Sequence, residues 1–75
     1  MATRITAKVR CNLKQDYGTG DHATTSLGFM PDHQDPANAE WAYYTPHLDL
    51  RMTVRGEIGR HFKPGAAYTL TFERG

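Results

Sequence analysis

Residues 48–55 read LDLRMTVR, and this stretch decides the fold of the chain. Its apolar residues occupy every second position: Leu48, Leu50, Met52 and Val54. Successive side chains of a β-strand point to opposite faces of its sheet, so the alternation predicts one strand with an apolar and a polar face. We place this strand at 47–55, because Gly56 ends the pattern.

The same two-residue period occurs near both ends of the chain. It predicts strands over 4–13 and 67–73, and a further strand over 24–30, which Pro31 ends. The first and last strands are the expected edges of the sheet. Side chains from all four strands and from their connections are predicted to form one contiguous core: Ile5, Val9, Leu13, Leu27, Phe29, Trp41, Leu48, Leu50, Met52, Val54, Phe62, Tyr68, Leu70 and Phe72.

The spacing of the apolar residues changes between the second and third predicted strands. Asp35-Pro36 is a typical helix start, because the Asp side chain can cap free N–H groups and Pro is tolerated at the first helical position. The spacing predicts a short helix over 36–44 that places Trp41 and Tyr44 on its core-facing side.

Together these elements predict a mainly β protein: about four antiparallel strands in a small sheet curled into a barrel or thin sandwich, with one short helix. A single turn over 57–62 that tucks in Ile58 and Phe62, followed by a type II turn at Lys63-Pro64-Gly65, connects the last two strands. A chain of 75 residues predicts one domain, spanning 1–75. So small a core rarely supplies more than about 3–5 kcal/mol, so we expect association with another chain to add stability.

Composition argues against several classes of protein. The formal net charge is +1, no apolar run is long enough to span a bilayer, and residues 1–10 lack the pattern of a signal peptide. We therefore expect synthesis and use in a reducing cytoplasm. Cys11 is the only cysteine and falls in the apolar register of its strand, which predicts a small buried hydrophobe.

The residues that carry catalysis or bind cofactors form no recognisable pattern. The four histidines are 11, 14 and 14 residues apart, which does not match the spacing of metal ligands, so we expect no metal. The Gly-Thr-Gly of residues 18–20 lacks the spacing and the Lys of a phosphate-binding loop. We expect no cofactor and no enzymatic activity.

Two groups of residues are candidates for binding instead. If the first and third strands pair, five cations gather on one polar face, which favours single-stranded nucleic acid or a nucleotide. These cations are Lys8, Arg10, Lys14, Arg51 and Arg55. Tyr43 is predicted to point away from the core, and exposed aromatic residues are enriched at protein interfaces. Tyr43, Arg51 and Arg55 are therefore the candidates for a protein interface.

The second half of the chain resembles a family of short tailed-bacteriophage and prophage proteins. The resemblance covers about residues 36–73 and rests on Asn38 and Trp41, Thr45-Pro46, the strand 48–54, and a Phe-x-Pro-Gly-x-x-Tyr-x-x-x-Phe ending. That ending consists of Phe62, Pro64, Gly65, Tyr68 and Phe72. The resemblance implies a phage origin and supplies no mechanism.

These observations favour a non-enzymatic phage accessory protein that acts by protein–protein contact. We expect a virion component, such as a capsid decoration or minor structural protein, that is made in the bacterial host cytoplasm. Its expected partners are a phage structural protein, a second copy of itself, or both, and no membrane. The alternative is a module that binds nucleic acid or a nucleotide, including an early protein that interferes with host defence.

Overall fold

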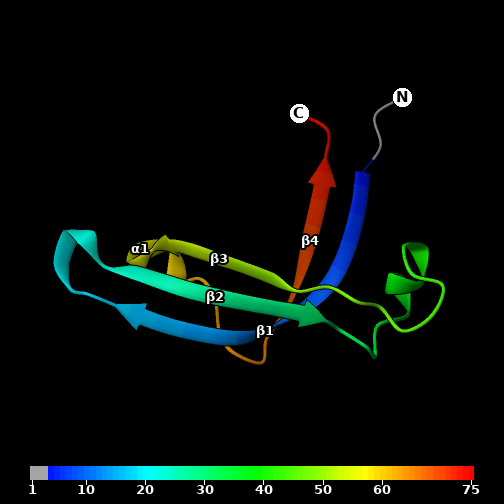
Figure 1. Cartoon of the computed structure of the whole chain (residues 1–75), viewed down its shortest axis with the longest axis horizontal. Coiled ribbons are helices and arrows are strands. Elements are labelled where there is room, and N and C mark those ends of the chain that lie inside the picture. Colours follow the sequence, from blue (N-terminus) through cyan, green and yellow to red (C-terminus); the bar gives the residue numbers. More distant parts are fainter. Residues whose placement is uncertain (1–3) are drawn as a thin grey trace.

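The computed structural model describes residues 4–75 and shows four antiparallel strands in a single curled sheet (Figure 1). The strands are β1 (Arg4–Tyr17), β2 (Thr24–Pro31), β3 (Leu50–Arg55) and β4 (Ala67–Glu73). Between them lie the short helices η1 (Gly20–His22), η2 (Pro36–Glu40) and α1 (Gly56–Gly59). The sheet forms a half-barrel, so the predicted mainly β fold is confirmed.

The predicted strands are all present, and three of them have a shifted end. The strand predicted over 67–73 matches β4, and the one predicted over 24–30 gains only Pro31. β1 continues to Tyr17 instead of ending at Leu13, because β2 pairs with it along its whole second half. β3 begins at Leu50 rather than near residue 47.

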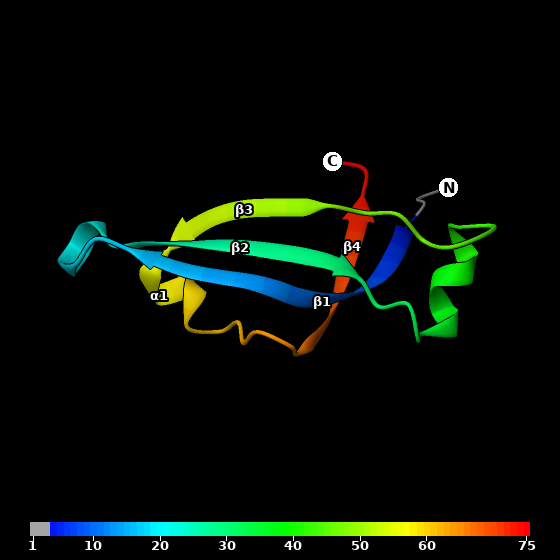
Figure 2. The same ribbon diagram turned by 60° about the horizontal axis from the view of Figure 1, so that its bottom comes forward.

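β1 is the central strand, and its two halves have different partners. The strand order is β3-β2-β1-β4, so the prediction that β1 forms an edge is wrong and the edges are β3 and β4. Residues 9–17 of β1 pair with β2, whereas residues 4–10 pair with β4. The first half of β1 and β4 therefore form a two-stranded arm that stands away from β2 and β3 (Figures 1 and 2). We call residues 4–10 and 67–73 the β1–β4 arm.

A β-bulge interrupts β1 at Asn12. Cys11 lies opposite Phe29, but the next pair along the ladder is Leu13 with Gly28, so one residue of β1 is extra. An extra residue reverses which face the following side chains occupy. Leu13 therefore leaves the core face, contrary to its predicted place in the core.

Gly28 makes this bulge possible. A Cβ atom at this position would come within 2.9 Å of Asn12 Oδ1 and 3.0 Å of Leu13 Cβ. Real Cβ atoms do not approach other atoms this closely without displacement, so a larger residue in β2 would push the bulged strand away.

The predicted helix over 36–44 is wrong in length and type. The chain forms the 3₁₀ helix η2, which Asp35 begins as expected by accepting a hydrogen bond from Ala37 N at 2.9 Å. Trp41 is half-buried against the core, but Tyr44 is 91% exposed. The helix ends at Glu40. Trp41, the next residue, packs against the core, and its Nε1 donates to Asn38 Oδ1 at 3.0 Å.

The fully buried core is small and lies around the middle of β1 and β2. It consists of Ala7, Val9, Cys11, Leu27 and Phe29, with half-buried Trp41, Leu48, Leu50, Val54, Phe62, Tyr68 and Leu70 packed around it. The predicted core positions Ile5, Met52 and Phe72 are exposed instead, and so is Ile58. Ile5, Met52 and Phe72 share the inner face of the sheet with the core, but the half-barrel does not close over them.

The connection from β3 to β4 packs against the inner face of the sheet. Helix α1 lies so close to β2 that a Cβ atom on Gly59 would be 2.5 Å from Thr25 Oγ1. The turn predicted at Lys63-Pro64-Gly65 is confirmed: Ala66 N donates to the Lys63 carbonyl at 3.1 Å, and Gly65 has a φ of 85°.

Candidate functional site

The concave inner face of the half-barrel carries an open apolar groove of about 160 Å³. Strands β1 to β4 each contribute side chains, because the alternation of every strand directs its apolar residues to this face. The lining residues are Val9, Phe29, Leu50, Met52, Phe62, Tyr68, Thr69 and Leu70. We call this the concave groove.

Three aromatic rings fix the shape of the concave groove. Phe29 packs edge-to-face on Phe62 and on Tyr68, with ring centroids 5.6 and 6.0 Å apart, and Phe62 and Tyr68 lie 5.1 Å from each other. The Tyr68 hydroxyl accepts a hydrogen bond from Lys63 N at 2.8 Å and faces the His61 carbonyl at 3.5 Å. The polar end of Tyr68 is thus satisfied by the backbone of the 60–66 loop, and its ring stays in the groove.

The apolar surface of the groove continues onto the β1–β4 arm. Ile5 and Phe72 lie opposite each other in the ladder and are 49% and 52% exposed. Met52, on the other side of the groove, is 41% exposed. Single exposed apolar residues are ordinary, but a contiguous apolar surface on a small protein is typical of a contact site.

Asn38 anchors the segment that closes one end of the sheet. Its side-chain amide replaces the missing strand beside Lys8: Oδ1 accepts from Lys8 N at 2.7 Å, and Nδ2 donates to the Lys8 carbonyl at 2.9 Å. Nδ2 also donates to the Asp32 carbonyl at 3.0 Å, and Oδ1 accepts from Trp41 Nε1 at 3.0 Å. The Asn-x-x-Trp spacing in the sequence therefore has a structural cause that the sequence analysis did not identify.

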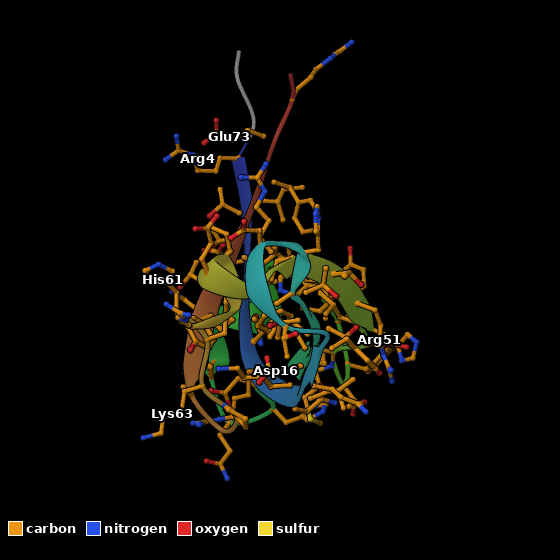
Figure 3. The ribbon with its side chains drawn as sticks, turned by 90° about the vertical axis from the view of Figure 1, so that its left-hand side faces the viewer. Arg4, Asp16, Arg51, His61, Lys63 and Glu73 are labelled. Atoms are coloured by element: carbon orange, nitrogen blue, oxygen red, sulfur yellow. The ribbon has the colours of Figure 1, made fainter. Side chains whose placement is uncertain are left out.

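Four of the five cations proposed for nucleic-acid binding share the outer face of the sheet, but β2 separates Lys8 and Arg10 on β1 from Arg51 and Arg55 on β3. β1 and β3 each pair with β2 and not with each other. The bulge turns Lys14 away from Lys8 and Arg10 to the opposite face of β1, where its Nζ donates to the Phe62 carbonyl at 3.0 Å. Two further basic residues, His61 and Lys63, lie on the opposite side of the molecule from Arg51 (Figure 3).

Four arginines are also paired with carboxylates. Arg10 Nε lies 3.3 Å from Asp32, and Arg51 and Arg55 each lie 3.7 Å from a neighbouring carboxylate, of Asp49 and Glu57. At the tip of the arm, Arg4 is 2.7 Å from Glu73. Surface pairs of this kind reduce the positive potential that would attract phosphate groups.

Tyr43 is fully exposed, at 100%, as the sequence predicts. It follows η2 and lies beside Tyr44, so the segment carries two exposed aromatic side chains. Tyr43 and Trp41 line a small hollow of about 190 Å³. The contribution of Tyr43 to an interface remains a prediction.

The groups that could support catalysis are dispersed over the described residues. Cys11 is buried, with Sγ 3.4 Å from the Leu13 carbonyl, as its position in the apolar register predicted. Within residues 4–75, His, Cys, Asp and Glu side chains form no group of three that could hold a metal ion.

Over the same residues, no helix has the length and apolar character to cross a membrane.

Comparison with models of protein families, with curated proteins and with solved structures finds no match for this chain.

Proposed function

We propose that this protein is a non-enzymatic accessory protein that acts by protein–protein contact through the concave groove. The observation that carries the proposal is that the inner face of the half-barrel holds an apolar groove, between β3 and β4, that no other segment of the described residues covers. Its partner would be an apolar segment of a larger protein. Burial of Ile5, Met52 and Phe72 by such a segment would supply part of the hydrophobic stabilisation that the small core lacks.

The resemblance of residues 36–73 to phage proteins supports a more specific proposal. The partner would be a phage structural protein, and the chain would be a virion component such as a capsid decoration or minor structural protein. Mass spectrometry of purified particles should then detect the chain at a fixed ratio to the capsid protein. Its absence from particles, while it is abundant in infected cells, would contradict this assignment.

The groove itself is tested by a pair of methionine substitutions. Met52 and Met30 are 41% and 39% exposed, but Met52 lines the concave groove and Met30 faces away from it, opposite Arg10. Met52→Glu should weaken binding to the particle at least tenfold, because a carboxylate would be desolvated against apolar side chains. Met30→Glu is the matched control and should leave binding unchanged. Equal effects of the two substitutions would show that the groove is not the binding site.

A further inference from the structure

Within residues 4–75, the outer edge of β4 lacks the devices that normally protect a strand edge from pairing with another chain. Edge strands are usually protected by Lys, by Pro, by a bulge or by a covering segment. β4 reads AYTLTFE and pairs with β1 without a break in register. Its only charged residue is Glu73, at its end. The other edge strand, β3, carries Arg51 and Arg55.

The unpaired backbone groups of β4 can be assigned to particular residues. Cys11 N donates to the Ala66 carbonyl at 3.1 Å, just before β4 begins. Bonds between antiparallel strands occur at every second residue, so Tyr68, Leu70 and Phe72 bond to β1. The N–H and C=O groups of Thr69, Thr71 and Glu73 therefore point outward. Near Ala67 the 60–66 loop flanks the strand, but the second half of β4 stands in the free part of the arm (Figures 1 and 2).

This free half of β4 is complementary to itself. A two-fold axis through Thr71 would place Thr71 opposite Thr71 of a second copy and Thr69 opposite Glu73. The backbone N–H and C=O groups of these residues point outward, so the β4 strands of the two copies could form a ladder of hydrogen bonds. On the inner face, Leu70 would lie opposite Phe72, and an aliphatic–aromatic pair is a favourable cross-strand contact. The exposed Phe72 ring would then be partly covered.

The charges also match in this register. Lys8 Nζ lies 2.8 Å from Thr69 Oγ1, on the outer face of the arm. Glu73 of the second copy would lie opposite Thr69 on that same face, within reach of Lys8. Its carboxylate would thus join Lys8 of one copy and Arg4 of its own, and the two-fold axis repeats the contact. No like charges face each other.

We propose that two copies of this chain pair antiparallel along Thr69–Glu73 of β4 and form one continuous eight-stranded sheet. The inference deepens the proposed function and rests on it, because it names a second copy as one protein partner. It uses an edge of the sheet and leaves the middle of the concave groove available for another protein.

Analytical ultracentrifugation of the whole chain from about 1 μM to about 1 mM tests the proposal, since this range covers weak to moderate association. The wild-type chain should shift from monomer to dimer. Thr71→Pro should weaken dimerisation at least tenfold, because Pro removes an outward N–H group and none of the bonds to β1. Thr53→Pro is the matched control: Gly56 N donates to the Ala23 carbonyl, so the same alternation makes Thr53 an outward residue of β3. It should dimerise normally.

A disulfide test fixes the register and does not depend on a proline variant folding. Opposed residues in a hydrogen-bonded antiparallel pair have Cα atoms about 5.5 Å apart, within the range that a disulfide requires. Thr71→Cys should therefore form a covalent dimer rapidly under mild oxidation, whereas Thr53→Cys, at a position that is also exposed, should not. Equal rates for the two variants, or a wild-type chain that stays monomeric to about 1 mM, would overturn the proposal.

The outcomes also separate this inference from the proposed function. A monomer that still binds its partner through the groove, with sensitivity to Met52→Glu, would refute the β4 pairing and leave the proposed function standing. A dimer that binds no partner would refute the proposed function and leave the β4 pairing standing.

Discussion

Asn38 is the residue on which the region beyond the end of β2 depends. It is buried, and its side-chain amide makes four hydrogen bonds. Two are with the backbone N–H and C=O of Lys8, one is with the Asp32 carbonyl, and one is with Trp41 Nε1. Removing such a side chain leaves buried donors and acceptors without partners, at about 1–3 kcal/mol for each group that water cannot reach.

We therefore expect Asn38→Ala to lower the free energy of unfolding by about 3 kcal/mol. Urea denaturation followed by Trp41 fluorescence would measure the change, because Trp41 is the only tryptophan and loses its bond to Asn38. Asn12→Ala is the control: Asn12 is exposed in the bulge, and surface substitutions of this kind change stability by less than about 0.5 kcal/mol. A similar loss for both variants would show that Asn38 has no special role.

Cys11 provides a second prediction at the scale of one residue. Its side chain is buried in the core, so the native protein should resist alkylation by iodoacetamide until urea unfolds it. Intact-mass measurement would follow the reaction. Cys11→Ala should destabilise the chain by about 1 kcal/mol and leave partner binding unchanged. Rapid labelling of the folded chain would instead indicate a reactive thiol.

At the scale of elements, the contact between α1 and β2 depends on the absence of a side chain at Gly59. An added Cβ would lie 2.5 and 2.6 Å from Thr25 Oγ1 and Cβ, and the Thr25 hydroxyl is held by Asp16 at 2.7 Å. Gly59→Ala should therefore displace α1 and cost about 1–3 kcal/mol. Thermal unfolding would measure the loss.

The same contact can be tested by a double-mutant cycle. Thr25→Ala removes Oγ1 and Cγ2, two of the three Thr25 atoms that the new methyl group would meet, so the Gly59→Ala/Thr25→Ala double variant should be more stable than the sum of the single losses implies. Strict additivity would mean that the two positions do not interact and that the close approach of α1 is not a constraint.

The elements also show which features the sequence could predict. Strand positions followed from local alternation, because the two-residue period is a property of each strand alone. The bulge at Asn12 did not, since it depends on Gly28, a residue of the neighbouring strand, and it moved Leu13 and Lys14 to unexpected faces. The helix over 36–44 was overestimated for a similar reason: Trp41 is held by Asn38, and spacing alone does not reveal that bond.

At the scale of the whole molecule, the open half-barrel explains why the predicted core and the observed core differ. Alternation assigns side chains to a face, but it does not say how much of that face is covered. Ile5, Met52 and Phe72 are on the inner face and yet exposed, since β3 and β4 do not meet to close the sheet. The predicted pairing of β1 with β3 is wrong, because β2 lies between them, and of the five cations only Lys14 leaves the outer face.

Association should be visible in the stability of the whole molecule. If the chain pairs along β4, the midpoint of thermal unfolding should rise with protein concentration, because dimerisation favours the folded state by mass action. Calorimetry over a hundredfold range of concentration would measure the rise, and Thr71→Pro should abolish it. A midpoint independent of concentration in the wild-type chain would contradict self-association.

The antiparallel register of the arm also places Arg4 beside Glu73, so both ends of the described chain leave from the same tip, away from the concave groove (Figures 1 and 3). A reporter or affinity tag genetically fused after residue 73, or before residue 4, would project from that tip without covering the groove. In the two-fold pair the tips point in opposite directions, so two fused cargoes would be carried on opposite sides of the assembly. The fold is thus suited to use as a display scaffold.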